Sequence, residues 1–151
     1  MLYKTNMEEL SQEEYSNYIQ KNLEQSFPQF IDYCRYEDDV YILEYPNPKN
    51  ELILWVSTQD DEVSIGLDKE SECLWHTHMS QFGAYEPESE LKEAIKFISE
   101  LFDGKQLIVT NEKNEIYVTD KPEKRVFPSL LIIAGMKMTF IFLNIRIQRM
   151  N

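Results

Sequence analysis

Histidine, cysteine and glycine are scarce in this chain of 151 residues, which holds two histidines, two cysteines and four glycines. No phosphate-binding loop is present, which argues against a nucleotide-dependent enzyme. Cys34 and Cys73 form neither a CxxC pair nor a disulfide framework, and the N-terminus lacks the apolar core of a signal peptide. We therefore expect a protein of the reducing cytoplasm.

Basic residues are outnumbered by acidic ones, 15 to 27, and the formal net charge is −12. Such an acidic chain neutralises phosphate groups poorly, so we expect no nucleic-acid partner. The charge is uneven, because residues 1–123 hold all 27 acids and 10 bases, whereas residues 124–151 hold the other 5 bases and no acid. We expect this basic, apolar tail to supply strands packed against the rest of the domain, with contact to lipid as the alternative.

A long uninterrupted apolar run is also missing. Residues 126–145 are mostly apolar, but Pro128, Gly135 and Lys137 divide them into two short runs. We therefore expect no membrane span and interpret the segment as a hairpin that turns at residues 134–137. The alternative explanation for the missing acids is an atypical or frame-altered terminus without a functional role.

The apolar content, 42%, is sufficient for one domain with a proper core over residues 1–151. Two amphipathic helices are predicted within it. Ser11 and Glu14 form a capping-box pattern at the start of the first, which should stop near Pro28. Pro87 suits the first turn of the second, which should end at Gly104 with one apolar face packed on a sheet.

Strand patterns lie between and after these helices, separated by short polar breaks. We predict strands at residues 30–36, 40–45, 51–57, 63–67, 74–78, 106–110 and 115–119. Consecutive short strands with polar turns indicate an antiparallel meander. The predicted fold class is therefore α+β, with a meander sheet and two amphipathic helices, one of them on a sheet face.

Both histidines, His76 and His78, lie in one of these strands. Alternate residues of a strand point to the same face, so the two imidazoles should face the same side and share a ligand or a proton. The pair suggests a zinc hydrolase of the deubiquitinase-like kind, but the positions where its motif continues are Glu86 and Ser89, and the acidic ligand is missing.

A metal-dependent hydrolase that uses His76 and His78 therefore remains the alternative function. A metal site without catalysis would add Asp68, Glu70 or Glu72 to the two imidazoles. The simpler interpretation is that the histidines bond neighbouring carboxylates or line a partner-binding surface. For Cys73, which alternates with Trp75, we expect a core environment, so neither thiol is a strong candidate nucleophile.

Acidic side chains gather beside the predicted turns. The clusters that we assign to partner binding are Asp60, Asp61 and Glu62, and Asp68, Glu70 and Glu72. Solvated loops are the alternative, but a concentrated negative field speeds encounter with a basic protein, such as a nuclease whose active site is built for phosphate. We add Trp75, His76 and His78 to this surface, with Trp75 as the aromatic anchor.

A family resemblance rests on several of these segments. They are residues 51–55, 61–67 and 74–79, the helix that Pro87 begins, and residues 106–110. In this order they resemble the small cytoplasmic immunity proteins that accompany bacterial polymorphic toxins, over residues 40–120. The resemblance implies a protein without catalytic activity or cofactor that binds and neutralises a cognate protein toxin.

Overall fold

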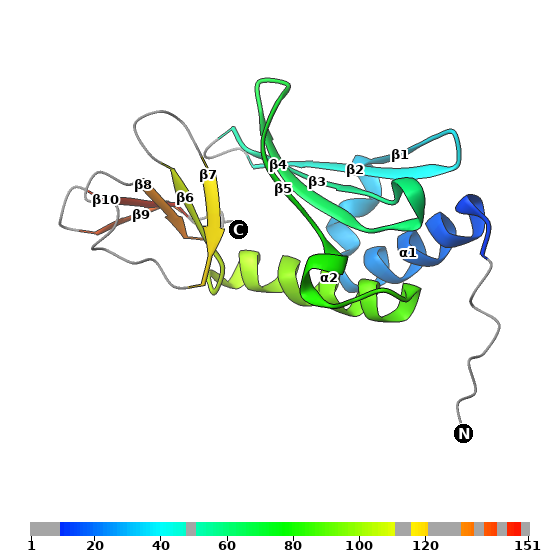
Figure 1. The fold of residues 1–151 in the computed structure, drawn as a ribbon. Coiled ribbons are helices and arrows are strands. Elements are labelled where there is room, and N and C mark those ends of the chain that lie inside the picture. The colour runs from blue at the N-terminus through cyan, green and yellow to red at the C-terminus, as the bar shows by residue number, and fades with distance from the viewer. Residues whose placement is uncertain are drawn as a thin grey trace. The chain divides into compact units, whose positions relative to one another are not determined.

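The computed structural model describes residues 10–47, 51–110, 116–120, 131–134, 138–141 and 145–148. Its helices are α1 (Gln12–Ser26) and α2 (Pro87–Asp103), with short 3-10 helices η1 (Pro28–Tyr33), η2 (Gln59–Asp61) and η3 (Met79–Phe82). The strands of the first sheet are β1 (Cys34–Glu37), β2 (Val40–Pro46), β3 (Ile53–Ser57), β4 (Ser64–Lys69) and β5 (Glu72–His78). Figure 1 shows these elements along the chain.

The five strands β1 to β5 pair in sequence order as an antiparallel meander, which confirms the predicted α+β class. By their contacts the residues divide into two compact units. The first unit contains residues 1–45, 54–66 and 76–95, and the second contains residues 46–53, 67–75 and 96–151. The single domain expected from the sequence stays a prediction.

The first helix begins and ends where the sequence predicts. Ser11 Oγ accepts the backbone N–H of Glu14, and the Glu14 carboxylate accepts the backbone N–H of Ser11, which completes the capping box. The helix stops at Pro28, which begins η1. Its buried side chains, Tyr15, Ser16, Ile19 and Leu23, recur at helical intervals and form the face that packs into the core.

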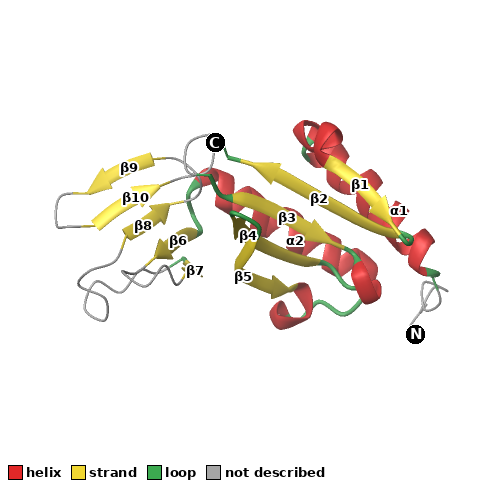
Figure 2. Ribbon diagram, turned by 90° about the horizontal axis from the view of Figure 1, so that it is seen from above, coloured by secondary structure: helices red, strands yellow, loops and turns green. Residues whose placement is uncertain are grey.

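The second helix, α2, also matches its predicted bounds. Its buried apolar side chains are Leu91, Ala94, Phe97, Ile98 and Leu101. Within the first unit, α1 and the first half of α2 lie along the same face of the meander (Figures 1 and 2). No helix of the described residues covers the other face of the strands in this unit, and we call this other side the open face.

Two hairpins of the meander turn through residues with positive φ. Asp38 and Asp39 (φ 46° and 63°) connect β1 to β2, and Glu70 and Ser71 (φ 53° and 66°) connect β4 to β5. Positive φ at both central residues is the type I′ geometry, which matches the twist of antiparallel strands. Because Glu and Ser suit that geometry less well than Gly or Asn, the alternating strand pattern and the core determine the turn here.

One predicted strand is wrong over most of its length. Residues 30–36 were expected to be extended, but Pro28–Tyr33 form η1 and only β1 is extended. The proline fixes φ for a helical turn, and Phe30, at 0% exposure, is buried by this turn against Phe27 and Tyr45. Tertiary packing of one aromatic ring therefore overrides the local strand preference.

The described strands of the C-terminal part are β6 (Leu107–Thr110), β7 (Ile116–Thr119), β8 (Leu131–Ala134), β9 (Met138–Ile141) and β10 (Ile145–Gln148). The predicted pairing of β6 with β7 is confirmed, and β6 pairs with β8 on its other side. β9 pairs with β10. The hairpin turn predicted at residues 134–137 lies largely outside the described residues. Among those described, no helix has the length and apolar character of a membrane span.

Candidate functional site

The histidine pair lies on the open face of β5. The ring centroids of His76 and His78 are 5.4 Å apart and their planes meet at 76°, so the alternation of the strand brings both imidazoles to one side. His78 Nδ1 forms a hydrogen bond of 2.6 Å with Ser64 Oγ on the neighbouring strand β4. His76 is exposed and His78 is half-buried. Ser64 therefore holds the ring of His78 in place, and His76 is accessible to solvent.

Trp55 extends this row of rings across the sheet. Its indole lies over Gly66 of β4, because a Cβ at Gly66 would overlap the Cε2, Cζ2 and Nε1 atoms of Trp55. On the far side of Gly66 the indole stacks beside His76, with centroids 6.4 Å apart and planes inclined by 28°. Because Gly66 has no side chain, the rings that β3 and β5 carry can meet above β4. We call the surface formed by Trp55, His76 and His78 the ring row.

Trp75, the aromatic anchor expected from the sequence, lies elsewhere. It follows the opposite alternation of β5 and stacks on Phe97 of α2, with centroids 5.7 Å apart and planes inclined by 15°. Its half-buried ring therefore belongs to the packing under the sheet. Trp55 is the tryptophan beside the histidines, and Gly66 is the sequence signal for it, because a strand glycine often marks a close approach.

The two assigned acidic clusters lie at opposite ends of one strand. Asp60, Asp61 and Glu62 precede β4, whereas Glu70 lies in the turn that follows it and Glu72 is the first residue of β5. Asp68 lies at the end of β4 and is half-buried, while Glu70 and Glu72 are exposed. The two clusters of the predicted acidic surface therefore belong to different compact units.

The first cluster is held in place by its neighbours. Gln12 of α1 accepts the backbone N–H of Asp61 at 3.2 Å and donates its own amide to the carbonyl of Thr58 at 2.7 Å. Glu62 accepts a hydrogen bond from Ser80 of η3. Asp60 and Asp61 keep positive φ values of 59° and 52°, with both side chains exposed. Glu62 is thus mainly a structural acceptor, whereas Asp60 and Asp61 present their carboxylates to solvent.

A cavity that the sequence did not predict opens beside this cluster, at the start of α2. It has a volume of about 280 Å³. It is lined by Leu10, Tyr15, Asp61, Tyr85, Glu86, Pro87 and Glu90. Glu90 is only 3% exposed, and its Oε2 accepts a hydrogen bond of 2.8 Å from the Tyr15 hydroxyl. The sequence contained one signal for this site, because Glu90 falls on the apolar side of α2, four residues before Ala94.

Burial raises the pKa of Glu90 above its ordinary value, and the nearby carboxylates of Glu62 and Asp61 raise it further. The hydrogen bonds from Tyr15 and from the backbone of Val63 oppose this increase. Burial, followed by the contact with Glu90, also raises the pKa of Tyr15. The Tyr15 hydroxyl therefore keeps its proton and donates it in the hydrogen bond to Glu90. The protonation of Glu90 depends on its burial, on this hydrogen bond and on the neighbouring carboxylates.

Removing this donor should destabilise the protein. We expect Tyr15→Phe to lower the free energy of unfolding at pH 7 by about 2 kcal/mol, since the bond joins a buried phenol to a charged group. Loss of the donor raises the folded-state pKa of Glu90 further. The penalty should therefore grow as pH rises from the folded-state pKa of the natural protein through that of the variant. Urea unfolding at pH 4.5 and pH 7 measures both effects.

Tyr36→Phe is the matched control for that substitution. The Tyr36 hydroxyl also bonds a side chain, Gln20 Oε1 at 2.6 Å, but the residue is 40% exposed. We expect it to cost less than about 1 kcal/mol, because water replaces the lost partner. Equal losses for the two variants, or a Tyr15→Phe penalty that shrinks with rising pH, would contradict this account of the Tyr15–Glu90 pair.

The thiol of Cys34 is not activated. Burial and the hydrogen bond that Cys34 Sγ donates to Glu24 raise the pKa of Cys34 to about 11, so the thiol stays protonated at neutral pH. The expected core position of Cys73 is wrong, since Cys73 is exposed. Trp75, two residues further into the strand, stacks on the ring of Phe97.

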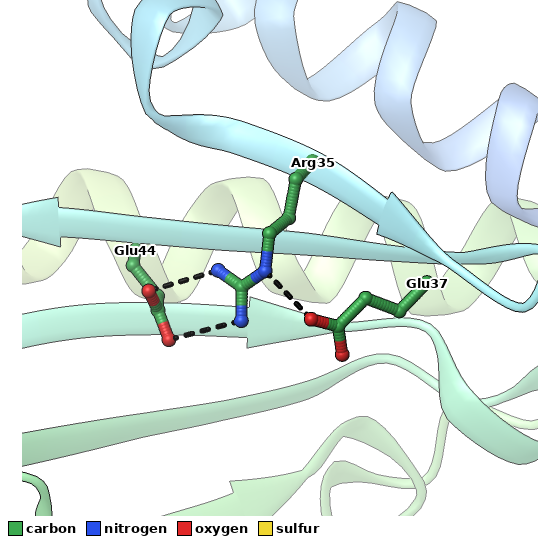
Figure 3. A network of polar contacts seen from close by, with 3 residues as sticks. All are labelled: Arg35, Glu37 and Glu44. Atoms are coloured by element: carbon green, nitrogen blue, oxygen red, sulfur yellow. Dashed lines mark hydrogen bonds and ion pairs between the residues drawn. The ribbon is translucent and has the colours of Figure 1, made fainter.

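Exposed carboxylates at the β1 edge of the sheet are neutralised locally. Arg35 donates to Glu37 Oε1 at 3.0 Å and to Glu44 Oε2 at 2.9 Å (Figure 3). The side chains are 45–60% exposed, so these ion pairs add little stability. Their effect is electrostatic, because the guanidinium of Arg35 offsets one of the two negative charges of Glu37 and Glu44.

Glu86 and Ser89, which occupy the positions where the hydrolase motif would continue, contact each other at the start of α2. Ser89 Oγ donates to the carbonyl of Glu86 at 2.9 Å and accepts its backbone N–H at 3.2 Å. Asp68, Glu70 and Glu72 do not complete a site with the imidazoles, because no group of three or more potential ligands for a metal ion occurs among the described residues.

We expect the purified protein to contain no stoichiometric zinc, because two imidazoles supply only half of a tetrahedral ligand set. His76→Ala together with His78→Ala should leave the circular dichroism spectrum unchanged. The melting temperature should fall by only a few degrees, from the lost contact to Ser64. Elemental analysis of protein purified without chelator is the measurement, and one tightly held metal ion per chain, lost in the double variant, would refute the prediction.

Comparison with protein-family models, curated proteins and solved structures found no match for this chain.

Proposed function

We propose that the protein is a non-catalytic immunity protein that binds a basic bacterial toxin in the cytoplasm and blocks its activity. The observation that carries this proposal is the charge around the cavity. The side chains that line it include the carboxyl groups of Asp61, Glu86 and Glu90 and no lysine, arginine or histidine. Asp60 and Asp61 in η2 and Glu86 beside the cavity are all exposed.

This surface suits a basic partner because its charge is not cancelled within it. At the β1 edge Arg35 pairs with Glu37 and Glu44. At the cavity, burial is the main cause that raises the pKa of Glu90, and the carboxylates of Glu62 and Asp61 raise it further. A concentrated negative field raises the rate of encounter with a basic protein and disfavours nucleic acid.

The ring row supplies the apolar part of the proposed interface. Tryptophan is enriched among residues that dominate binding energy, and Trp55 lies on the open face with His76 beside it. Trp75 has its ring against Phe97 and is not proposed as a contact. We therefore place the aromatic anchor at Trp55 and keep His76 and His78 as neighbouring contacts.

Co-expression with the toxin encoded beside the gene tests the proposal. The protein should restore growth of cells that make the toxin, and the purified pair should form a stable complex. Growth that the protein does not rescue, together with no complex at micromolar concentrations, would overturn it.

Within such a complex, Trp55→Ala should increase the dissociation rate constant by about 30-fold or more, since loss of a central aromatic anchor costs about 2 kcal/mol or more. Trp75→Phe is the matched control, because it also alters a tryptophan but keeps the ring stacked on Phe97. Surface plasmon resonance measures both rates. Equal dissociation rates for the two variants would remove Trp55 from the interface.

A further inference from the structure

We propose that the cavity at the start of α2 receives one cationic side chain, an arginine or a lysine, that the partner protein presents. The inference rests on the proposed function for the identity of the partner. It adds the place where the partner is held and the chemistry that recognises it.

The cavity combines two kinds of wall. Its carboxylates are those of Asp61, Glu86 and Glu90, and its aromatic and apolar walls come from Tyr15, Tyr85, Leu10 and Pro87. Carboxylates bind a guanidinium or ammonium group through charge-assisted hydrogen bonds. Aromatic faces attract the same groups through the ring quadrupole, and apolar walls cover the methylene stem. A cation on an apolar stem is the ligand that uses both kinds of wall.

The charge of the cavity lining argues against an anionic ligand. The lining contains no lysine, arginine or histidine. The helix α2 directs its N-terminus toward the cavity, but that end carries only about half a positive charge. The exposed carboxylates of Asp61 and Glu86 alone exceed this several-fold, so the field in the cavity stays negative and an anionic group is repelled. A cation removes the mutual repulsion of the carboxylates, which favours its binding in addition to direct contact.

The cavity is built before any partner arrives. Tyr15 and Glu90 are 1% and 3% exposed, and their 2.8 Å hydrogen bond fixes the carboxylate at the wall. Gln12 holds the backbone of Asp61 on another side. Tyr85 is 76% exposed, so its ring is available to contact an entering stem. Rigid acceptors with one exposed ring lower the ordering cost of binding.

The size of the cavity selects a side chain over a larger ligand. Sites for drug-sized molecules usually have about 300–1,000 Å³. At about 280 Å³ this cavity falls just below that range. A single arginine or lysine side chain with its hydration water therefore matches it.

A titration with methylguanidinium chloride and, separately, butylammonium chloride tests the site without any toxin. Amide shifts of the full chain are followed by nuclear magnetic resonance, with sodium chloride at matched ionic strength as the control. We expect saturable shifts centred on Tyr15, Asp61 and residues 85–90 that sodium chloride does not produce. Shifts that are absent, or that sodium chloride reproduces, would overturn the cation site.

Variants show whether the carboxylates and the ring form the site. Asp61→Asn and Tyr85→Ala change exposed side chains and should stay folded. Each should weaken cation binding, and Asp61→Asn should do so by about tenfold, as expected for one charge of a close pair. Glu37→Gln, beside Arg35, is the charge-matched control and should leave binding unchanged. Equal effects of Glu37→Gln and Asp61→Asn would overturn the site.

The toxin complex separates this inference from the proposed function. If Asp61→Asn with Tyr85→Ala binds the toxin as tightly as the natural protein, the cavity receives no partner side chain and the proposal is overturned, although the immunity function stands. If the small cations bind saturably but no toxin complex forms, the cation site is supported and the immunity function is overturned.

Discussion

Ile98→Asp is expected to unfold the protein at 25 °C. Ile98 lies on the buried face of α2 with 0% exposure. An unpaired carboxylate there costs several kcal/mol, or must take up a proton at a similar cost, and the whole free energy of unfolding of such a domain is about 5–15 kcal/mol. Circular dichroism and thermal unfolding should show loss of helix signal and of the cooperative transition.

Ile95→Asp is the matched control, since it makes the same chemical change one turn earlier in the same helix. Ile95 is half-buried, so its carboxylate can reach water. We expect this variant to stay folded with a lower melting temperature. A folded Ile98→Asp whose melting temperature matches that of Ile95→Asp would contradict the assigned core face of α2.

The elements that the sequence predicts best are those whose signals are local. The capping box of Ser11 and Glu14, and the proline that starts α2, each set a helix boundary within a few neighbouring residues. The period of two in β5 places His76 and His78 on one face for the same reason. Residues 30–33 are mispredicted because Phe30 packs against Tyr45, a ring 15 residues away that no local pattern reveals.

The candidate sites depend on contacts that no local pattern encodes. Trp55 meets His76 only because the intervening strand has Gly66 at that register, and the register of β3, β4 and β5 is a tertiary property. Likewise, the cavity brings Tyr15 of α1 to Glu90 of α2, which are 75 residues apart. The sequence therefore predicts which residues carry charge and rings, whereas the fold decides which of them meet.

Strand alternation alone, however, would have corrected the choice of anchor. Trp75 and His76 are adjacent, and adjacent strand residues point to opposite faces. Trp75 packs against Phe97 for that reason. The exposed ring beside the histidines had to come from another strand, and β3 supplies it.

Removing the two exposed charges of η2 should slow capture of the toxin about tenfold at low salt. Asp60→Asn with Asp61→Asn deletes two carboxylates whose field acts on the encounter, and electrostatic steering changes association rates by about 10- to 1,000-fold. Asparagine is chosen because Asp60 and Asp61 have φ values of 59° and 52°, a region that asparagine tolerates better than serine. The backbone of η2 should therefore keep its conformation.

Stopped-flow association with the neighbouring toxin, measured across salt concentrations, gives the rate and its salt dependence. At 1 M salt the Debye length falls to about 3 Å, so the rates of the natural protein and the double variant should converge. Glu37→Gln with Glu44→Gln is the control. It removes the same formal charge at the edge where Arg35 already offsets the acids, and a smaller loss of rate is expected there. A rate that responds neither to salt nor to the η2 substitutions would show that the acidic turn does not steer the partner, and the capture of a basic toxin through this surface would be refuted.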